Sequence, residues 1–268
     1  MTDLMVGLLA ILAASLIVGG VGYVLWIRGQ LKLLGRKMDE TRALVALEAS
    51  GQHRQALPWS EWSLSPDSIL TLLSYLPSGR TSHVVECGAG LSTVYLAQHL
   101  RAIGKGHLWS VEHDPAWAVR VRRWLDERHL SGWATVVDAP LKDGWYDRDA
   151  LHETLTEAAP IDLLTVDGPP AAVAKDARFP ALPFFEAALA PHATVVLDDG
   201  HRQDETRIAQ RWSEQGWTRH LVRTRAGLWV LRREARGSQA PEPVVVRSAP
   251  PAAPAGVASH RSDTRRAS

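Results

Sequence analysis

Short apolar runs rich in β-branched residues alternate with helical stretches over the middle of the sequence. The runs begin near residues 83, 108, 134, 161 and 194, and a helical stretch follows each of them. This order is typical of a parallel sheet with helices on both faces. Two further runs, Thr218–Thr224 and Leu228–Arg232, are separated only by Arg225-Ala226-Gly227. So short a link requires an antiparallel hairpin. The predicted fold class is therefore α/β, a Rossmann-like doubly wound sheet that is mostly parallel and closes with an antiparallel β-hairpin.

The beginning of the sequence is strongly apolar. Leu4–Ile27 carries no formal charge, and four basic residues follow it, namely Arg28, Lys32, Arg36 and Lys37. A helix of this length measures roughly 36 Å, enough for a hydrocarbon layer of ~30 Å. A cleaved signal peptide is the alternative, but the stretch is long and has no basic segment before it. We therefore expect residues 1–28 to form a single-pass transmembrane anchor in the inner (plasma) membrane. The basic residues place the following domain in the cytoplasm.

Three further parts follow the predicted anchor. Residues 29–56 have an amphipathic pattern and are interpreted as a stalk or linker, and residues 57–233 as one folded domain. Residues 234–268 are dominated by Ala, Pro, Ser and Arg, which predicts a disordered tail. The net charge of +1 gives no global field that would attract nucleic acid, so no nucleic-acid partner is expected. The sequence does not indicate an oligomeric state.

The first predicted strand runs into a glycine-containing turn, Glu86-Cys87-Gly88-Ala89-Gly90-Leu91-Ser92-Thr93. Gly88 and Gly90 permit a sharp turn and a close approach of the backbone to a ligand, and the next helix offers free N–H groups. The third glycine of the dinucleotide fingerprint is missing, and no G-K-[ST] of a P-loop follows. The carboxylate of Glu86 beside the turn suits the ammonium group of a ligand, directly or through water.

Two further carboxylates end the next two predicted strands. Glu112 lies 22 residues past Gly90, the spacing at which an acidic side chain meets ribose hydroxyls. Asp138 ends the third strand and is a candidate to face an adenine amino group. A helix cap or a surface carboxylate is the alternative interpretation of both residues.

Five segments in this order resemble bacterial class I S-adenosyl-L-methionine (SAM) methyltransferases of the methyltransferase-24 type. They are Glu86–Thr93, Val111–Asp114, Asp162–Pro170, Arg178–Pro183 and Leu197–Glu205. The resemblance covers roughly residues 59–233. It implies five β-α units closed by a hairpin and SAM as methyl donor, contacted through Glu86, Gly88, Gly90, Ser92 and Glu112. We accordingly expect a membrane-anchored methyltransferase that acts on oxygen or nitrogen of a small-molecule or lipid-linked acceptor.

Acidic residues also end the fourth and fifth predicted strands. Asp167 ends the fourth, Asp198 and Asp199 end the fifth, and His201 follows. The three aspartates should converge in one pocket near the transferred methyl group, because parallel strands end at the same edge of a sheet. Asp167, Asp199 or His201 is then the candidate general base.

Two alternatives remain open at this point. Catechol-type O-methyltransferases, similar in topology, hold a metal on an Asp and an Asp-Asn pair at these strand ends, and three oxygen ligands suit Mg²⁺ or Mn²⁺. We favour a site without metal, because Asp199 could cap the following helix and Arg202 could pair with Asp198. The other alternative is a catalytically inactive SAM-binding membrane scaffold.

Overall fold

The computed structural model of the protein describes residues 2–50, 57–76 and 82–233. The predicted tail, residues 234–268, and the last residues of the predicted linker lie outside the described residues. The helices are α1 (Thr2–Ser50), α2 (Pro66–Ser74), α3 (Leu91–Ile103), α4 (Pro115–Glu127), α5 (Arg148–Thr154), α6 (Ala181–Phe185) and α7 (Gln203–Ser213), with 3₁₀ turns η1 (Thr156–Ala158) and η2 (Glu186–Ala188). The strands are β1 (His83–Cys87), β2 (His107–Glu112), β3 (Ala134–Asp138), β4 (Leu141–Lys142), β5 (Trp145–Tyr146), β6 (Ile161–Val166), β7 (Leu189–Leu197), β8 (Trp217–Val222) and β9 (Leu228–Arg233).

A seven-stranded sheet in the order β3-β2-β1-β6-β7-β9-β8 forms the centre of the domain. β1 pairs in parallel with β2 on one side and with β6 on the other, so the strand order reverses between β1 and β6. β9 pairs antiparallel with both β7 and β8. The predicted α/β fold with a mostly parallel sheet and a closing antiparallel hairpin is confirmed. Ligands bind at such a reversal point, outside the carboxyl ends of the strands.

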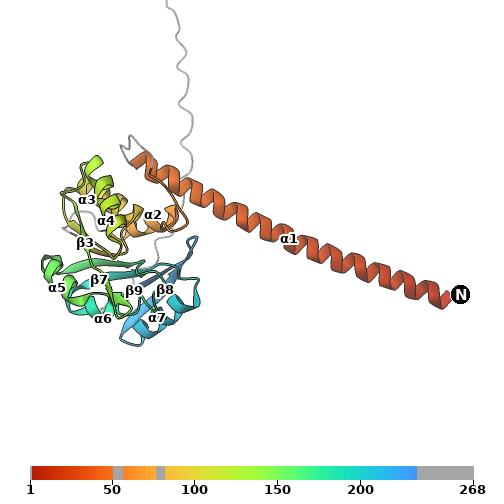
Figure 1. Ribbon diagram of the computed structural model, residues 1–268. Coiled ribbons are helices and arrows are strands. Elements are labelled where there is room, and N and C mark those ends of the chain that lie inside the picture. The colour runs from red at the N-terminus through yellow and green to blue at the C-terminus, as the bar shows by residue number, and fades with distance from the viewer. Residues whose placement is uncertain (1, 51–56, 77–81, 234–268) are drawn as a thin grey trace, which may run out of the picture. The chain divides into compact units, whose positions relative to one another are not determined.

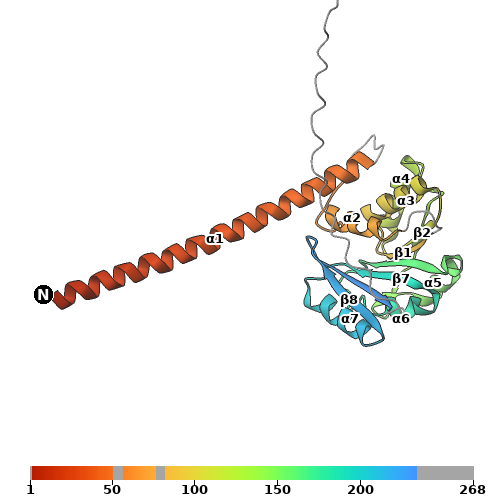
Figure 2. The same cartoon turned by 180° about the vertical axis from the view of Figure 1, so that it is seen from behind.

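Successive residues along each central strand enter two different hydrophobic cores. Side chains alternate between the two faces of a strand, so each strand contributes to both cores. One core contains Val84, Leu108, Leu163 and Val196 and packs against α2, α3 and α4. The other contains Val85, Trp109, Leu164 and Val195 and packs against α5, α6 and α7. Figures 1 and 2 show these two helical layers on opposite sides of the sheet.

The last turns of α1 belong to the first of these cores. Ala43 and Leu47 are buried, and Leu47 packs in the core that α2 and α3 cover. The Tyr95 hydroxyl of α3 donates a hydrogen bond of 2.8 Å to Glu48 Oε1. α2, which the sequence patterns did not predict, contacts α1 directly. The end of α1 is therefore part of the folded domain.

The predicted transmembrane anchor is wrong. Within residues 2–50, 57–76 and 82–233, no helix is long and apolar enough to cross a membrane. α1 continues without a break from its apolar first half into charged sequence. The predicted single-pass topology and the inner-membrane location with a cytoplasmic domain, both of which depended on this anchor, are withdrawn.

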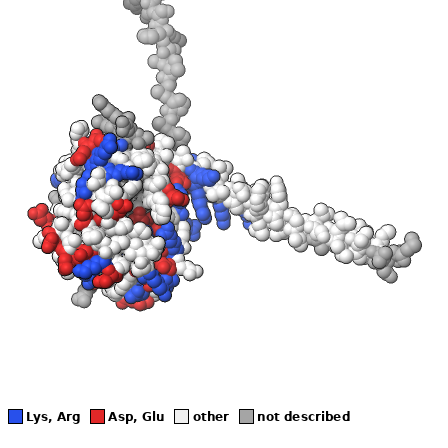
Figure 3. Space-filling view, viewed as in Figure 1, with Lys and Arg blue, Asp and Glu red and all other residues white. Residues whose placement is uncertain are grey.

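Charged side chains of both signs are interspersed over the face of the domain seen in Figure 3. Ion pairs on helix surfaces include Arg123 with Glu127 at 2.8 Å. Mixed charges of this kind cancel at a distance. This face therefore carries no extended field of one sign.

The packing of α1 can be tested at Leu47. Leu47→Ala should lower the free energy of unfolding by about 2–5 kcal/mol, because it leaves a cavity in the core. The matched control is Val45→Ala on the same helix, where the side chain is 62% exposed and the change should stay within about 0.5 kcal/mol. Urea unfolding of the full chain measures both. Equal values for the two variants would contradict the placement of α1 in the core.

Candidate active site

A cavity of about 660 Å³ lies at the carboxyl ends of β1, β2, β6 and β7. Its walls are the loop after β1, the end of β2 with the start of α4, and the segments that follow β6 and β7. Residues 61–65, ahead of α2, and the turn between β8 and β9 complete it. Trp62 lines this cavity and is 80% exposed. The volume is in the range of small-molecule and cofactor sites, about 300–1,000 Å³.

Two glycines of the loop after β1 have different surroundings. Gly88 has φ +99°, and a Cβ atom there would lie 2.9 Å from the backbone nitrogen of Gly168. The loops after β1 and β6 can therefore approach each other only without a side chain at position 88. Gly90 lines the cavity, and a Cβ atom at position 90 would have no protein atom within 4 Å. Its open side thus faces the space that a ligand would fill.

Glu86 lies beneath this loop and does not line the cavity. It is 1% exposed and accepts hydrogen bonds from the hydroxyls of Thr93, at 2.5 Å, and Ser110, at 2.6 Å. Thr93 Oγ1 in turn accepts the N–H of Gly90 at 2.8 Å. Burial raises the pKa of Glu86 to about 7. Glu86 therefore fixes the loop through Thr93 instead of facing an ammonium group in the cavity.

Glu112 lines the cavity with a carboxylate held by backbone groups. Its Oε1 accepts the N–H groups of His113 and Asp114 at 2.7 and 2.8 Å. Its Oε2 accepts the N–H of Ala89 at 3.2 Å. A carboxylate oxygen can accept a second bond, so Oε2 keeps capacity for a ligand hydroxyl. Ser92, 2% exposed, also lines this cavity.

Asp138 and His201 lie outside the cavity lining. Asp138 is 57% exposed and forms an ion pair with Arg122 at 2.6 Å. His201 is exposed, donates its N–H to the Ala226 carbonyl at 3.0 Å, and has its ring against Gly227. The structure therefore does not bring these two predicted site residues to the cavity, because each one is held by a contact outside it.

Asp167, Asp198 and Asp199 come together at the strand ends, with one carboxylate oxygen of each within 4.8 Å of the others. All three line the cavity, and Asp167 is 20% exposed. Burial, followed by the repulsion of Asp199, raises the pKa of Asp167 to about 6 against the attraction of Arg178. Burial and the carboxylates of Asp167 and Asp199 raise the pKa of Asp198 well above its ordinary value.

Arg178 neutralises much of this negative charge, a role that the sequence patterns did not indicate. Its guanidinium, 4% exposed, lies 3.1 Å from Asp167, 3.0 Å from Asp199 and 3.6 Å from the buried Glu205. Arg178 stands in one of the five family-like segments, but its position between the strand ends depends on the path of the chain after β6.

Asp199 and Asp198 have other partners than the sequence predicts. Asp199 does not cap α7, because Arg202 is the cap residue and its side chain makes no cap hydrogen bond. Asp199 instead adopts φ +59° and pairs with Arg202 at 2.6 Å. Arg202 therefore pairs with Asp199 and not, as expected, with Asp198. The Oδ1 atom of Asp198 is buried and lacks a hydrogen-bond partner among the described residues.

Tyr146 is a second cavity residue that the sequence analysis missed. It is 1% exposed, lines the cavity, and its hydroxyl has no hydrogen-bond partner among the described residues. It belongs to the small β4–β5 hairpin, whose turn is Asp143-Gly144 with φ +54° and +83°. An Asp-Gly turn is a strong hairpin signal, so the sequence did contain the evidence for this element. A buried hydroxyl without a partner is suited to bind a ligand.

A divalent metal fits this carboxylate cluster poorly. Mg²⁺ requires near-octahedral oxygen ligands at roughly 2.0–2.1 Å. The guanidinium of Arg178 already contacts Asp167 and Asp199, and Arg202 contacts Asp199 again. A cation would have to compete with both arginines for these carboxylates.

Comparisons with known proteins agree with this geometry. Residues 85–200 match the family described as "Methyltransferase domain". An SAH-bound methyltransferase from Podospora anserina is 15% identical, covers 72% of this chain and 88% of its own length, and has a TM-score of 0.51. An O-methyltransferase of tomaymycin synthesis from Streptomyces achromogenes, solved in complex with SAM, is 20% identical over 70% of this chain and 89% of its own, with a TM-score of 0.48. No curated protein matches.

The family match covers the glycine loop, Glu112 and the three aspartates. The Podospora anserina structure supports the fold. The family match spans less than half of the 268-residue chain, and over that part the chain resembles the methyltransferase family. The protein is an enzyme, a SAM-dependent methyltransferase.

The two loop glycines give a paired test of the cofactor side. Gly88→Ala should lower the free energy of unfolding by about 1–3 kcal/mol, because φ +99° is strained for alanine and Gly168 is too close. Gly90→Ala should leave that free energy within about 0.5 kcal/mol of the wild type. Its methyl group should instead weaken binding of S-adenosylhomocysteine (SAH) about tenfold by overfilling the cavity. Urea unfolding and calorimetry measure the two effects. Wild-type SAH affinity in Gly90→Ala would mean that the cofactor does not contact this wall.

Proposed function

We propose that the protein transfers the methyl group of SAM to a hydroxyl oxygen of a small-molecule acceptor, with Asp167 as general base and without a divalent metal. The observation that carries the proposal is the position of Asp167. Its carboxylate ends β6, lines the cavity beside the glycine loop, and has a pKa of about 6. A base of this pKa is ionised at neutral pH and still has a useful affinity for a proton.

The cofactor side of the cavity fits SAM through groups of this chain. SAM supplies an electrophilic methyl group on a sulfonium. Glu112 Oε2 has capacity for a ribose hydroxyl, and the Tyr146 hydroxyl offers a donor without a competing partner. Gly90 and Ser92 leave room at the start of α3 for a polar group of the cofactor. Glu86 acts indirectly. It accepts a hydrogen bond from the Thr93 hydroxyl, which in turn accepts the N–H of Gly90.

On the acceptor side, Asp167 takes the proton that the hydroxyl loses as its oxygen attacks the methyl group. Arg178, at 3.1 Å, orients the Asp167 carboxylate and limits the rise of its pKa. Asp199 holds Arg178 from the other side at 3.0 Å. In-line displacement depends strongly on such positioning, so Arg178 and Asp199 are positioning residues in this mechanism.

Metal-dependent transfer of the catechol type is the second candidate, favoured by one observation. Three aspartate oxygens within 4.8 Å of one another are a possible set of ligands for a hard cation. The two arginines on the same carboxylates argue against it. A chelator distinguishes the two mechanisms.

Asp167→Asn should reduce turnover of the acceptor at least about a hundredfold, because the amide cannot accept the proton. SAH affinity should stay near the wild-type value. The matched control is Asp138→Asn, which removes a carboxylate at the end of β3 outside the cavity. The acceptor is first identified by metabolite profiling of a deletion strain, in which it accumulates one methyl group short. Turnover is then followed with labelled SAM, and SAH binding by calorimetry.

A chelator separates the two candidate mechanisms in the same assay. Wild-type turnover should be unchanged after treatment with EDTA. Loss of turnover with EDTA and its return with Mg²⁺ would replace the proposal by the metal-dependent mechanism. Undiminished turnover by Asp167→Asn would remove Asp167 from the chemistry in either case.

The pH dependence follows from the pKa of Asp167. Protonation removes the base, so kcat/KM should be constant above about pH 6 and fall about tenfold per pH unit below it. Arg202 lowers this pKa, so Arg202→Gln should raise it and move the midpoint to higher pH. Initial rates give the profile, and ¹³C NMR of the Asp167 carboxyl gives its titration directly. A midpoint that stays in place or moves to lower pH in Arg202→Gln would be incompatible with Asp167 as the base.

A further inference from the structure

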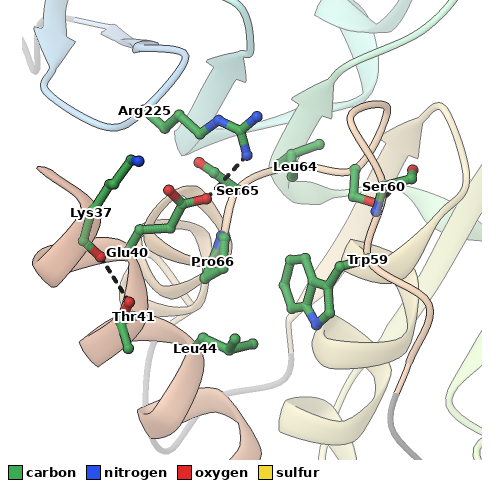
Figure 4. A pocket seen from close by; sticks show the side chains of 11 residues that line it. Lys37, Glu40, Thr41, Leu44, Trp59, Ser60, Leu64, Ser65, Pro66 and Arg225 are labelled. Atoms are coloured by element: carbon green, nitrogen blue, oxygen red, sulfur yellow. Dashed lines mark hydrogen bonds and ion pairs between the residues drawn. The ribbon is translucent and has the colours of Figure 1, made fainter. Parts of the chain in front are cut away.

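A second cavity of about 400 Å³, here called the α1 pocket, lies next to the active-site cavity. Figure 4 shows its walls, which come from α1, from the segment ahead of α2 and from the turn between β8 and β9. Four residues line both cavities, namely Ser63, Leu64, Ser65 and Arg225. The α1 pocket and the active-site cavity therefore adjoin each other at these four residues.

Specific contacts hold the three walls together. Arg225 Nη1 pairs with Glu40 Oε1 of α1 at 3.0 Å. The backbone N–H of Arg225 donates to Asp67 Oδ2 at the start of α2, at 2.9 Å. The buried Leu47 anchors α1 one to two turns further along. These contacts therefore fix the three walls of the α1 pocket relative to one another.

The chemistry of the α1 pocket changes from one side to the other. Lys37 and Arg225 lie with Glu40 on one side, and the apolar side chains of Leu44 and Trp59 lie on the other (Figure 4). Arg225 is paired with Glu40, whereas the ammonium of Lys37 has no ion pair among the described residues. The charged side thus has one positive charge in excess and complements an anion.

We propose that the α1 pocket binds the part of the acceptor remote from the methylated oxygen, and that this part is an anionic group on an apolar body. This inference rests on the proposed function, because the residues that line both cavities connect the α1 pocket with the site of methyl transfer. The anion pairs with Lys37 and Arg225, and the apolar body packs on Leu44, Trp59 and Leu64. The acceptor class is therefore a small amphipathic acid that carries a hydroxyl group.

The probe for the test is 8-anilinonaphthalene-1-sulfonate, an aromatic body with one anionic group, added to the full chain saturated with SAH. Bound SAH occupies the cofactor side of the active-site cavity and so prevents the probe from binding there. N-phenyl-1-naphthylamine is the uncharged analogue. Binding is followed by probe fluorescence. The sulfonate should bind more tightly than the uncharged analogue, and its affinity should fall with added salt.

Thr41→Trp is the decisive variant. Thr41 is exposed, lines the α1 pocket but not the active-site cavity, and its hydroxyl bonds only to the Lys37 carbonyl of its own helix. An indole there should fill the α1 pocket and weaken the sulfonate at least about tenfold. The control is Ala46→Trp, on an exposed position of α1 that does not line the α1 pocket. Its affinity for the probe should equal that of the wild type.

Lys37→Gln tests the charge. The sulfonate should bind up to about fivefold more weakly, the range of one exposed ion pair, and the uncharged analogue should bind as before. Arg36→Gln removes the neighbouring charge, which does not line the α1 pocket, and should change neither affinity.

Calorimetry with SAH on every variant keeps the two proposals separate. If Thr41→Trp binds SAH with wild-type affinity but no longer binds the sulfonate probe, the proposed role of the α1 pocket is supported. Equal binding of the sulfonate by Thr41→Trp and Ala46→Trp, or equal binding of the charged and uncharged probes by the wild type, overturns it. Absence of SAH binding by the wild type contradicts the cofactor site whatever the probe does.

Discussion

The active site depends on how the chain accommodates several carboxyl groups in one poorly hydrated place. Asp167, Asp198 and Glu205 all have raised pKa values, because burial disfavours their charged forms. The buried guanidinium of Arg178 reaches Asp167, Asp199 and Glu205 at 3.0–3.6 Å. A planar cation with five donors suits several carboxylates at once better than a lysine would. The same contacts fix the ends of β6 and β7 relative to each other.

Burying these charged groups together costs desolvation free energy. Charges buried together are not a source of net stability in general, since their desolvation offsets much of their attraction. The arrangement instead leaves the carboxylate of Asp167 at the cavity with its pKa raised to about 6. Groups with such shifted pKa values gather at functional sites. Asp167 is therefore the group on which the proposed mechanism is built.

The sequence predicted the features that arise from local patterns. The alternation of apolar runs and helical stretches gave the sheet, the three-residue link after Thr224 gave its closing hairpin, and strand ends gave Glu112, Asp167, Asp198 and Asp199. Contacts between segments that lie far apart in the sequence could not be predicted from these patterns. Asp138 ends a strand, but its side chain pairs with Arg122. Arg178 lies in a long loop and contacts Asp167. Glu86 is buried under the glycine turn that it holds in place through Thr93. The Asp143-Gly144 pair is a hairpin signal that the sequence analysis did not use. The apolar start of α1 was interpreted as a membrane anchor, which the structure contradicts.

The residues that shape the α1 pocket all lie before residue 67 or after residue 224, outside the segment that matches the methyltransferase family. The α1 pocket thus lies outside the family-like segment, and most of the cofactor side lies inside it. Exchange of residues 37–66 together with the β8–β9 turn would be a rational route to a changed acceptor with an unchanged methyl donor. If the α1 pocket binds the acceptor as proposed, the family-like segment by itself does not determine what is methylated.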